Sequence, residues 1–283
     1  MTAPSRFSRS HRVVAGDPPG AADVLARVTG LSKGIVKDAM RKGAVHVGRS
    51  GRSPNRLRRE TATVRPGDVL EIHYDPELLA LRPPEAKLVK DAIRWSAWSK
   101  PAGLLSQGTE FGDHASLLRQ VEKLLDRPVF LVHRLDREVE GLVLVAHDAT
   151  AAAALSALLR EARVVKRYRA EVIGNVEAHR GKEGTIDLPV DDKPARTSFR
   201  VDSYDPLRDT TTLDVTIETG RHHQIRRHLD AIGHPVLGDP RYGAGNKNRE
   251  GIRLAAVFLG FKDPFTGKEV ELRLGETQEP AAS

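Results

Sequence analysis

VHRLDREVEGLVLVAHD, residues 132–148, places a cluster of charged side chains directly before an apolar run. The run Leu142–Ala146 predicts a buried strand. Asp136 lies between Arg134 and Arg137, just ahead of that strand. A carboxylate in this position is either a loop residue held by its neighbours or an ionised nucleophile, and the stretch by itself leaves both open.

The sequence on both sides of this stretch is rich in predicted strands. Alternation or short apolar runs indicate strands at Phe130–Val132, Leu142–Ala146 and residues 165–174, 195–201, 210–218, 253–261 and 268–274. Helices are predicted over Leu117–Leu125 and from the cap Asp148 to about Arg160. Most strands lie too close together for helical crossovers, so we expect an α+β fold with a mixed, largely antiparallel sheet.

The net positive charge of the chain is confined to its first third. The 283 residues carry a formal charge of +7, and residues 1–82 hold 15 Lys and Arg against 8 Asp and Glu. The remainder has 30 of each kind. This asymmetry indicates a polyanion-binding module attached to a neutral body, although a solubilising basic face would give the same count.

The basic module contains two predicted helices, the second of which begins after the N-cap Ser32 and stops at Gly43. The second helix carries four basic residues, the first three spaced along one face: Lys33, Lys37, Arg41 and Lys42. Such a row suits contact with phosphates. We expect a disordered basic tail at residues 1–15, a small α/β domain at 16–82, a linker at 83–89 and the main body at 90–283.

Composition excludes several classes of protein. No run of about 18 apolar residues is present, so a transmembrane helix is excluded. The first 16 residues lack the apolar core of a secretory signal. The absence of cysteine removes disulfides, thiolate catalysis and cysteine-based zinc sites, and it fits a cytoplasmic protein.

Metal and nucleotide motifs are weak. Three nearby histidines suggest a metal site: His222, His223 and His228. Their spacing does not bring them to one helical face, so we expect surface or RNA-facing histidines and no metal site. An acidic group is interpreted as an exposed turn: Asp187, Asp191 and Asp192. The HRLD sequence departs from a kinase catalytic loop, and residues 238–247 lack the Gly-Lys-Ser/Thr sequence of a P-loop.

Four separated segments carry a family resemblance: SKPAGLLSQG at residues 99–108, the HRLD stretch at 132–148, KRYRAEVIG at 166–174 and TGRHHQIRRHLDAIGHPVLGDPRYG at 219–243. In this order they resemble the motifs of pseudouridine synthases of the RluA type. Residues 20–75 are similar to the small S-four RNA-binding module that commonly precedes that domain. The resemblance implies the pseudouridine synthase fold and an isomerase that converts uridines in structured RNA without a cofactor.

The resemblance also implies roles for single residues. Asp136 would begin the reaction on the ribose–uracil unit. Arg226 would keep it ionised, with Arg221 as the rival for that role. Tyr168 would stack on the extruded base. Secondary substrate contacts are expected from His133, Arg134, Leu135, Arg221, Ile225 and Lys100. Among these, Lys100 is expected to meet the RNA backbone and His133 to hold the loop.

One departure from the family pattern is Val139–Glu140, which stands where Thr-Ser is usual. A second carboxylate four residues from Asp136 would raise the pKa of Asp136 if the two lie close. This departure favours an alternative, a catalytically silent RNA-binding or ribosome-assembly factor on the same fold. The first expectation is a cytoplasmic, monomeric enzyme without an obligate protein partner or membrane association, acting on ribosomal RNA, with transfer RNA second.

Overall fold

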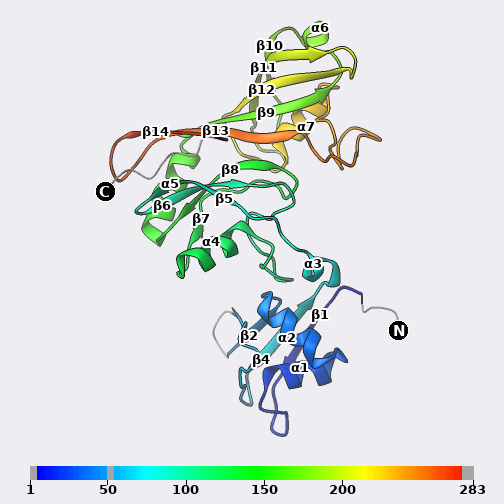
Figure 1. Cartoon of the computed structure of the whole chain (residues 1–283), viewed down its shortest axis with the longest axis vertical. Helices are drawn as coiled ribbons and strands as arrows, with labels where there is room; N and C mark the ends of the chain where they lie inside the picture. Colours follow the sequence, from blue (N-terminus) through cyan, green and yellow to red (C-terminus); the bar gives the residue numbers. More distant parts are fainter. Residues whose placement is uncertain (1–4, 50–53, 276–283) are drawn as a thin grey trace. The chain divides into compact units, whose positions relative to one another are not determined.

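The computed structural model describes residues 5–49 and 54–275, and these residues form two compact units (Figure 1). The first unit comprises the chain up to Pro83 together with Gln107–Leu125. The second comprises Pro84–Ser106 and the chain from Asp126 onward. The chain therefore passes from the first unit to the second, returns, and crosses once more.

The first unit is built on a four-stranded antiparallel sheet in the order β1-β4-β2-β3. Its elements are β1 (Phe7–Arg12), α1 (Ala21–Thr29), α2 (Lys33–Arg41), β2 (Val45–Gly48), β3 (Asn55–Arg56), β4 (Val69–Tyr74), α3 (Pro76–Ala80) and α4 (Leu117–Leu125). Leu25 of α1, Met40 of α2 and Leu70 of β4 are fully buried in one core. The side chain of Ser32 accepts the Ile35 N–H, so the predicted start of α2 is confirmed.

The expected disordered tail is wrong for residues 7–12. These residues form β1, which pairs with β4 along its whole length. Phe7 anchors the strand, because its ring lies 5.5 Å from the ring of Tyr74, centroid to centroid. Polar composition suggested disorder, but backbone pairing with an existing strand needs few apolar side chains. Residues 1–4 of the tail lie outside the described residues.

The assignment of residues 107–125 to the body is also wrong, because Gln107–Leu125 groups with the first unit. Arg58 holds it through an ion pair in which Nη1 donates to Asp113 Oδ1 at 2.8 Å. Arg56 adds a bond from Nη2 to the Thr109 carbonyl at 2.7 Å. The helix expected at 117–125 does form, but it belongs with the basic module.

The second unit is built on a ten-stranded sheet in the order β10-β11-β12-β9-β13-β8-β6-β5, with β14 paired to β13 and β7 to β8. Its strands are β5 (Lys87–Ala92), β6 (Trp95–Lys100), β7 (Phe130–Leu131), β8 (Glu140–Ala146), β9 (Val165–Ile173), β10 (Glu183–Asp187), β11 (Arg196–Asp205), β12 (Thr210–Ile217), β13 (Leu254–Lys262) and β14 (Glu269–Arg273). Its helices are α5 (Ala149–Arg160), α6 (Val176–Arg180) and α7 (Gln224–Ala231). Among the strand pairs of the described residues only β8 and β13 run parallel, which confirms the expected mixed, largely antiparallel α+β fold.

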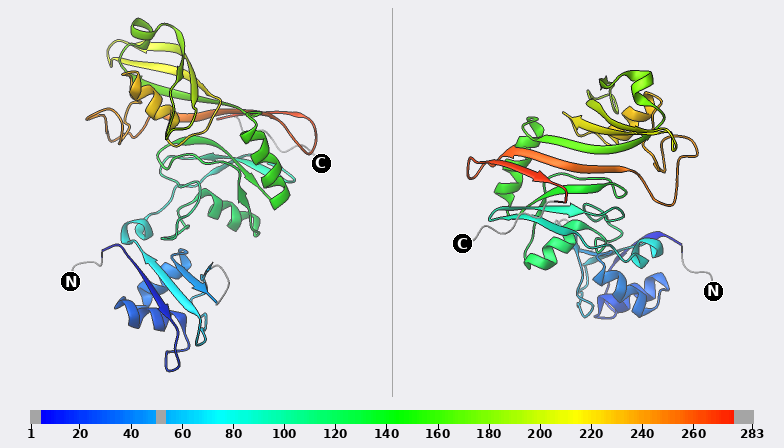
Figure 2. Two further views of the ribbon diagram at one scale, coloured as in Figure 1. Left: turned by 180° about the vertical axis from the view of Figure 1, so that it is seen from behind. Right: turned by 45° about the horizontal axis from the view of Figure 1, so that its top comes forward.

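The apolar run Leu142–Ala146 lies in β8, an interior strand of the sheet. Six of its seven residues are buried, because it lies between β6 and β13 and is covered by α5 (Figure 2). Gly141 permits the close approach to β13, since a Cβ there would lie 2.3 Å from the Ala256 carbonyl oxygen. The loop before β8 carries Asp136, so this tight packing fixes the position of that carboxylate.

Candidate active site

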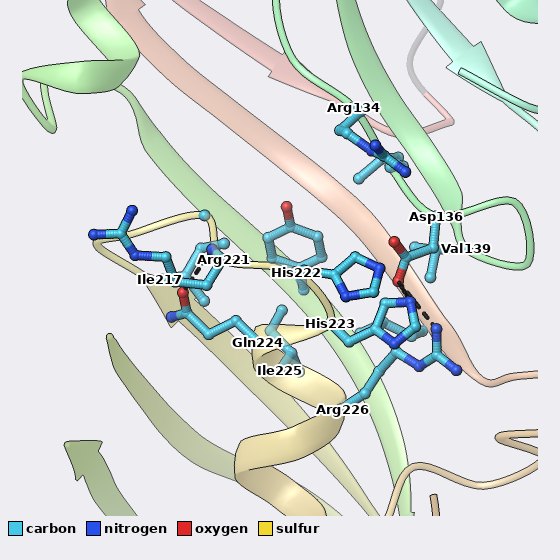
Figure 3. Close-up of a pocket in the computed structure, with 14 residues that line it drawn as sticks. Arg134, Asp136, Val139, Ile217, Arg221, His222, His223, Gln224, Ile225 and Arg226 are labelled. Carbon is cyan, nitrogen blue, oxygen red and sulfur yellow. Dashed lines mark hydrogen bonds and ion pairs between the residues drawn. The ribbon is translucent and has the colours of Figure 1, made fainter. Parts of the chain in front are cut away.

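Three segments far apart in the sequence meet at one pocket in the second unit. Asp136 lies in the loop between β7 and β8, Tyr168 lies on β9, and Arg226 lies on α7. The pocket has a volume of about 200 Å³, which is on the scale of a single nucleoside. Its lining, most of it labelled in Figure 3, comprises Arg134, Leu135, Asp136, Val139, Tyr168, Ile217, Gly220, Arg221, His222, His223, Gln224, Ile225, Arg226 and Leu254.

Arg226 connects two carboxylates and is almost fully buried, with 1% of its surface exposed. Its Nη1 donates to Asp136 Oδ2 at 3.0 Å. Its Nε and Nη2 donate to the two oxygens of Asp239 at 2.6 and 2.7 Å. Asp239 therefore fixes the plane of the guanidinium, and the remaining Nη1 is aimed at Asp136.

Asp239 is a residue that sequence reasoning missed. Burial alone would raise its pKa, but hydrogen bonds from Arg226 and from backbone N–H groups hold the pKa below its ordinary value. Two of those donors are the N–H groups of Arg241 and Tyr242, at 2.9 and 3.2 Å. Its place in the motif GDPRYG, at residues 238–243, was the available signal.

His223 is the second missed residue. It is buried, and its Nε2 lies 3.4 Å from Asp136 Oδ2 while its Nδ1 lies 3.2 Å from the Tyr242 hydroxyl. Burial, and after it the positive charge of Arg226, lowers the pKa of His223, whereas Asp136 acts in the opposite direction. The ring is therefore held mainly neutral near pH 7.

Tyr168 lies in the pocket wall between β12 and β13, where it pairs with Val215 and Ala256. Burial, with a smaller contribution from the charge of Asp136, raises the pKa of Tyr168 above its ordinary value. The phenol is therefore protonated throughout the neutral range.

The loop that carries Asp136 is fixed by backbone contacts. Ser106 accepts the Leu135 N–H at 2.9 Å and donates to the Leu135 carbonyl at 2.7 Å. Leu135 and Ile225 are both buried and line the pocket, as expected of pocket walls. Val139 also lines the pocket, whereas Glu140 is exposed and outside the lining.

The expectation that Lys100 meets the RNA backbone is wrong. Its side chain is fully buried. Its Nζ donates to the carbonyl oxygens of Leu104, Pro101 and Arg137 at 2.8, 3.1 and 3.4 Å. Burial lowers the pKa of Lys100 to about 8. Because Arg137 follows Asp136 directly, Lys100 ties the end of β6 to the Asp136 loop instead of facing solvent.

His133 and Arg134, although adjacent in the sequence, have different surroundings. His133 is outside the pocket lining, and its Nε2 accepts the Leu144 N–H at 3.1 Å, which holds the loop against β8. Arg134 is exposed and lines the pocket. Arg221 also lines it, but its Nε donates to the Pro194 carbonyl at 3.2 Å and its guanidinium points away from Asp136 in Figure 3. The guanidinium beside Asp136 is thus that of Arg226.

The expectation of surface or RNA-facing histidines is wrong for His228, whereas His223 is buried but lines the pocket. His223 is buried beside Asp136, and His228 is buried with its ring nitrogens 2.9 Å from the Thr197 hydroxyl and the Leu188 carbonyl. His222 is exposed. Helical spacing did not apply to His222 and His223, because α7 begins only after His223.

In the first unit, the basic row on α2 is only partly open. Lys33 pairs with Asp23 at 2.6 Å, and Arg41 pairs with Glu60 at 2.6 Å. Lys42 donates to the Leu79 carbonyl at 2.6 Å and is partly buried. The side chains of Lys33 and Arg41 are nevertheless 53% and 54% exposed, so these ion pairs leave both of them at the surface.

Comparison with known proteins places this pocket in a family. Residues 94–231 match the model described as RNA pseudouridylate synthase. An uncharacterized RNA pseudouridine synthase of Chloroflexus aurantiacus is 32% identical over 91% of this chain and 87% of its own length. The chain is an RNA pseudouridine synthase. The motifs at 132–148 and 166–174 lie inside the matched range.

Two further relatives are informative for this synthase. The ribosomal large subunit pseudouridine synthase D of Nitrosomonas europaea is 37% identical over 168 residues, 51% of this chain and 46% of its own. The solved structure of human RNA pseudouridylate synthase domain containing 4 aligns with a TM-score of 0.56 at 22% identity, over 67% of this chain and 88% of its own. The structural match shows a shared fold, and the sequence matches show an isomerase that acts on RNA.

The synthase has no candidate membrane span in its described part. None of the helices found between residues 5 and 275, outside the gap at 50–53, has the length and apolarity needed to cross a bilayer.

The bond accepted by His133 predicts acid sensitivity of the synthase. Burial, and then the charge of Lys166, lowers the pKa of His133 to about 4. The neutral ring therefore stabilises the fold above the unfolded pKa near 6.5, and this contribution is lost as pH falls toward 4. Between pH 7.5 and 5 we expect a loss of about 2 kcal/mol from this residue. Urea unfolding at pH 7.5 and 5 should show that the free energy of unfolding falls less for His133→Gln than for wild type. Equal falls would show that His133 is not the source of the acid sensitivity.

Proposed function

We propose that this synthase isomerises uridine in large-subunit ribosomal RNA through Asp136, Arg226 and Tyr168. The observation that carries the chemistry is one pocket-lining carboxylate, Asp136, held by the buried guanidinium of Arg226. The similarity to the Nitrosomonas europaea enzyme, whose name specifies the ribosomal large subunit, supports the choice of RNA. Transfer RNA is the second choice.

The reaction breaks the bond between ribose C1′ and uracil N1, rotates the base and joins C1′ to C5. C5 loses its hydrogen as a proton to solvent and N1 gains a proton, so the product is an isomer of uridine. Asp136 begins the reaction at the ribose–uracil unit, because it is the carboxylate lining the pocket. Arg226 orients Asp136 and places a positive charge beside it through the bond at 3.0 Å.

Tyr168 supplies the wall against which the extruded base stacks. Because its pKa is raised, the phenol enters the reaction protonated and offers a hydrogen bond to the base. Its hydroxyl is also proposed to relay the proton that leaves C5. Arg134, exposed at the pocket, is proposed to contact the phosphate or to fill the gap that the flipped nucleotide leaves.

The first unit is proposed to be the S-four-like RNA-binding domain, with its core at residues 16–82. The excess positive charge of residues 1–82 supports this role. Phosphate contacts made there would add affinity without reading sequence. A cytoplasmic monomer that needs no protein partner remains the accompanying proposal.

Neutralising Lys37 on α2 should weaken RNA binding in a salt-dependent way. Among the described residues 5–49 and 54–275, Lys37 is the member of the row that forms no ion pair, and its side chain is half-buried. We expect Lys37→Gln to lower the slope of log K against log salt by about one, as for one lost phosphate contact. Binding would be measured by filter retention between low and moderate salt. Lys268→Gln, an exposed charge in the second unit, is the matched control and should leave the slope unchanged.

The experiment that tests the proposed function is a map of pseudouridines in ribosomal and transfer RNA from a strain that lacks the gene and from its parent. We expect a site in large-subunit RNA to be lost and then restored by the wild-type gene. Loss confined to transfer RNA would reassign the substrate. An unchanged map would support the silent-factor alternative, which no feature of the pocket favours.

A further inference from the structure

Two consecutive histidines present their rings on the same side of the chain beside Asp136. Consecutive side chains normally diverge at a helix start. His223 has a left-handed backbone, with φ of 55°, immediately before α7. This conformation brings the ring of His222 onto that of His223, with centroids 3.8 Å apart and planes tilted by 24°. In Figure 3 both rings lie beside the Asp136 carboxylate.

The three side chains form a compact set of donors for a metal ion. One donor atom each from Asp136, His222 and His223 all lie within 4.8 Å of one another. Imidazole nitrogen and carboxylate oxygen are the ligands that zinc uses when cysteine is absent. Three protein ligands leave one position of a tetrahedral ion to water.

The local charge also suits a dication. Arg226 is shared between Asp136 and Asp239, so these three groups together carry one negative charge. The Tyr242 hydroxyl, 3.2 Å from Nδ1 of His223, orients that ring from outside, as partners of metal-ligating histidines do.

We propose that Asp136, His222 and His223 bind one divalent transition-metal ion of the zinc class and that this ion inhibits isomerisation. Inhibition follows because the ion takes the carboxylate oxygens that the reaction needs and fills the pocket mouth. The inhibitory part rests on the proposed function of Asp136, whereas binding does not. The exposed His222 admits the ion from solvent.

The binding test uses the full-length protein without RNA, titrated with zinc chloride in a calorimeter. Loss of outer partners of a metal site costs roughly 10- to 100-fold in affinity, and loss of a ligand should cost at least as much. We expect one ion per chain for wild type and at least tenfold weaker binding for His222→Ala. His179→Ala is the matched control, because His179 and His234 form a second histidine pair with nitrogens 3.3 Å apart.

Cobalt(II) provides a second readout, since a histidine-ligated ion gives visible absorption that should be lost in His222→Ala and kept in His179→Ala. Absent binding, or equal zinc isotherms for wild type and His222→Ala, would overturn the proposal. Loss of binding only in His179→Ala would overturn it as well, because it would place the ion at the other pair.

The inhibition test measures release of tritium from carbon 5 of labelled uridine in RNA. We expect saturating zinc to abolish release by wild type and a chelator to restore it. The rate of each protein with zinc is compared with its own rate without metal. At the zinc concentration that abolishes release by wild type, His222→Ala should keep its metal-free rate. Zinc that binds wild type without slowing it would overturn the proposal. No release without metal would instead refute the proposed function, and the isotherms would still decide the metal site.

Discussion

Asp136→Asn should leave a folded protein that forms no detectable pseudouridine. The substitution keeps the size of the side chain and its position beside Arg226, but removes the charge that begins the reaction. Loss of a covalent or proton-transferring group of this kind costs at least about 10³-fold in rate. The rate would be measured in single turnover on ribosomal RNA from a strain lacking the gene, where the target uridine is unmodified.

Glu140→Gln is the matched control for this variant. It also removes one carboxylate near the loop, but Glu140 is exposed and does not line the pocket. We expect its rate to stay within a few-fold of wild type. If Asp136→Asn kept its rate, or if Glu140→Gln lost activity equally, the assignment of Asp136 would be wrong.

Arg226→Met should cost both stability and activity. Removal of the guanidinium leaves Asp239, whose side chain is fully buried, without its partner. Breaking a buried ion pair from one side costs about 3–5 kcal/mol. For a chain of this size such a loss lowers the melting temperature by roughly 10 °C. Thermal unfolding followed by circular dichroism at neutral pH would measure it.

Two variants separate the stability effect from the effect on catalysis. Arg226→Lys keeps the positive charge but cannot donate to Asp136 and both oxygens of Asp239 at once. We expect a smaller loss of melting temperature and still at least about a 10²-fold loss of rate, because Asp136 is no longer oriented. Combining Arg226→Met with Asp239→Asn should recover part of the stability and none of the rate. Recovery of activity in that double variant would contradict the positioning role.

Local sequence patterns were sufficient to predict the positions of most strands of the second unit. The strands β9, β11, β12 and β13 lie where alternation indicated, because each buries one face against a neighbour. The membership of residues 107–125 could not be read from local pattern. It depends on Arg58 and Asp113, which are 55 residues apart in the sequence and form an ion pair only in the folded chain.

Site residues were predictable where their position in a motif identifies them. They were less predictable where the backbone conformation determines which side chains come together. Asp136, Tyr168 and Arg226 were proposed from motif positions, and the structure brings them to one pocket. Lys100 was misplaced, because a lysine is usually exposed and nothing local shows that three carbonyls surround it. His222 and His223 come together through a left-handed residue that helical spacing does not anticipate.

The most direct test of the central claim is tritium release from carbon 5 of uridine by the purified wild-type chain, with a chelator present to remove inhibitory ions. The substrate is large-subunit ribosomal RNA from the strain that lacks the gene. We expect release that reaches one tritium for each target uridine and that stops when Asp136 is replaced by Asn. Absence of release from that RNA, while the protein is folded and binds it, would contradict the account.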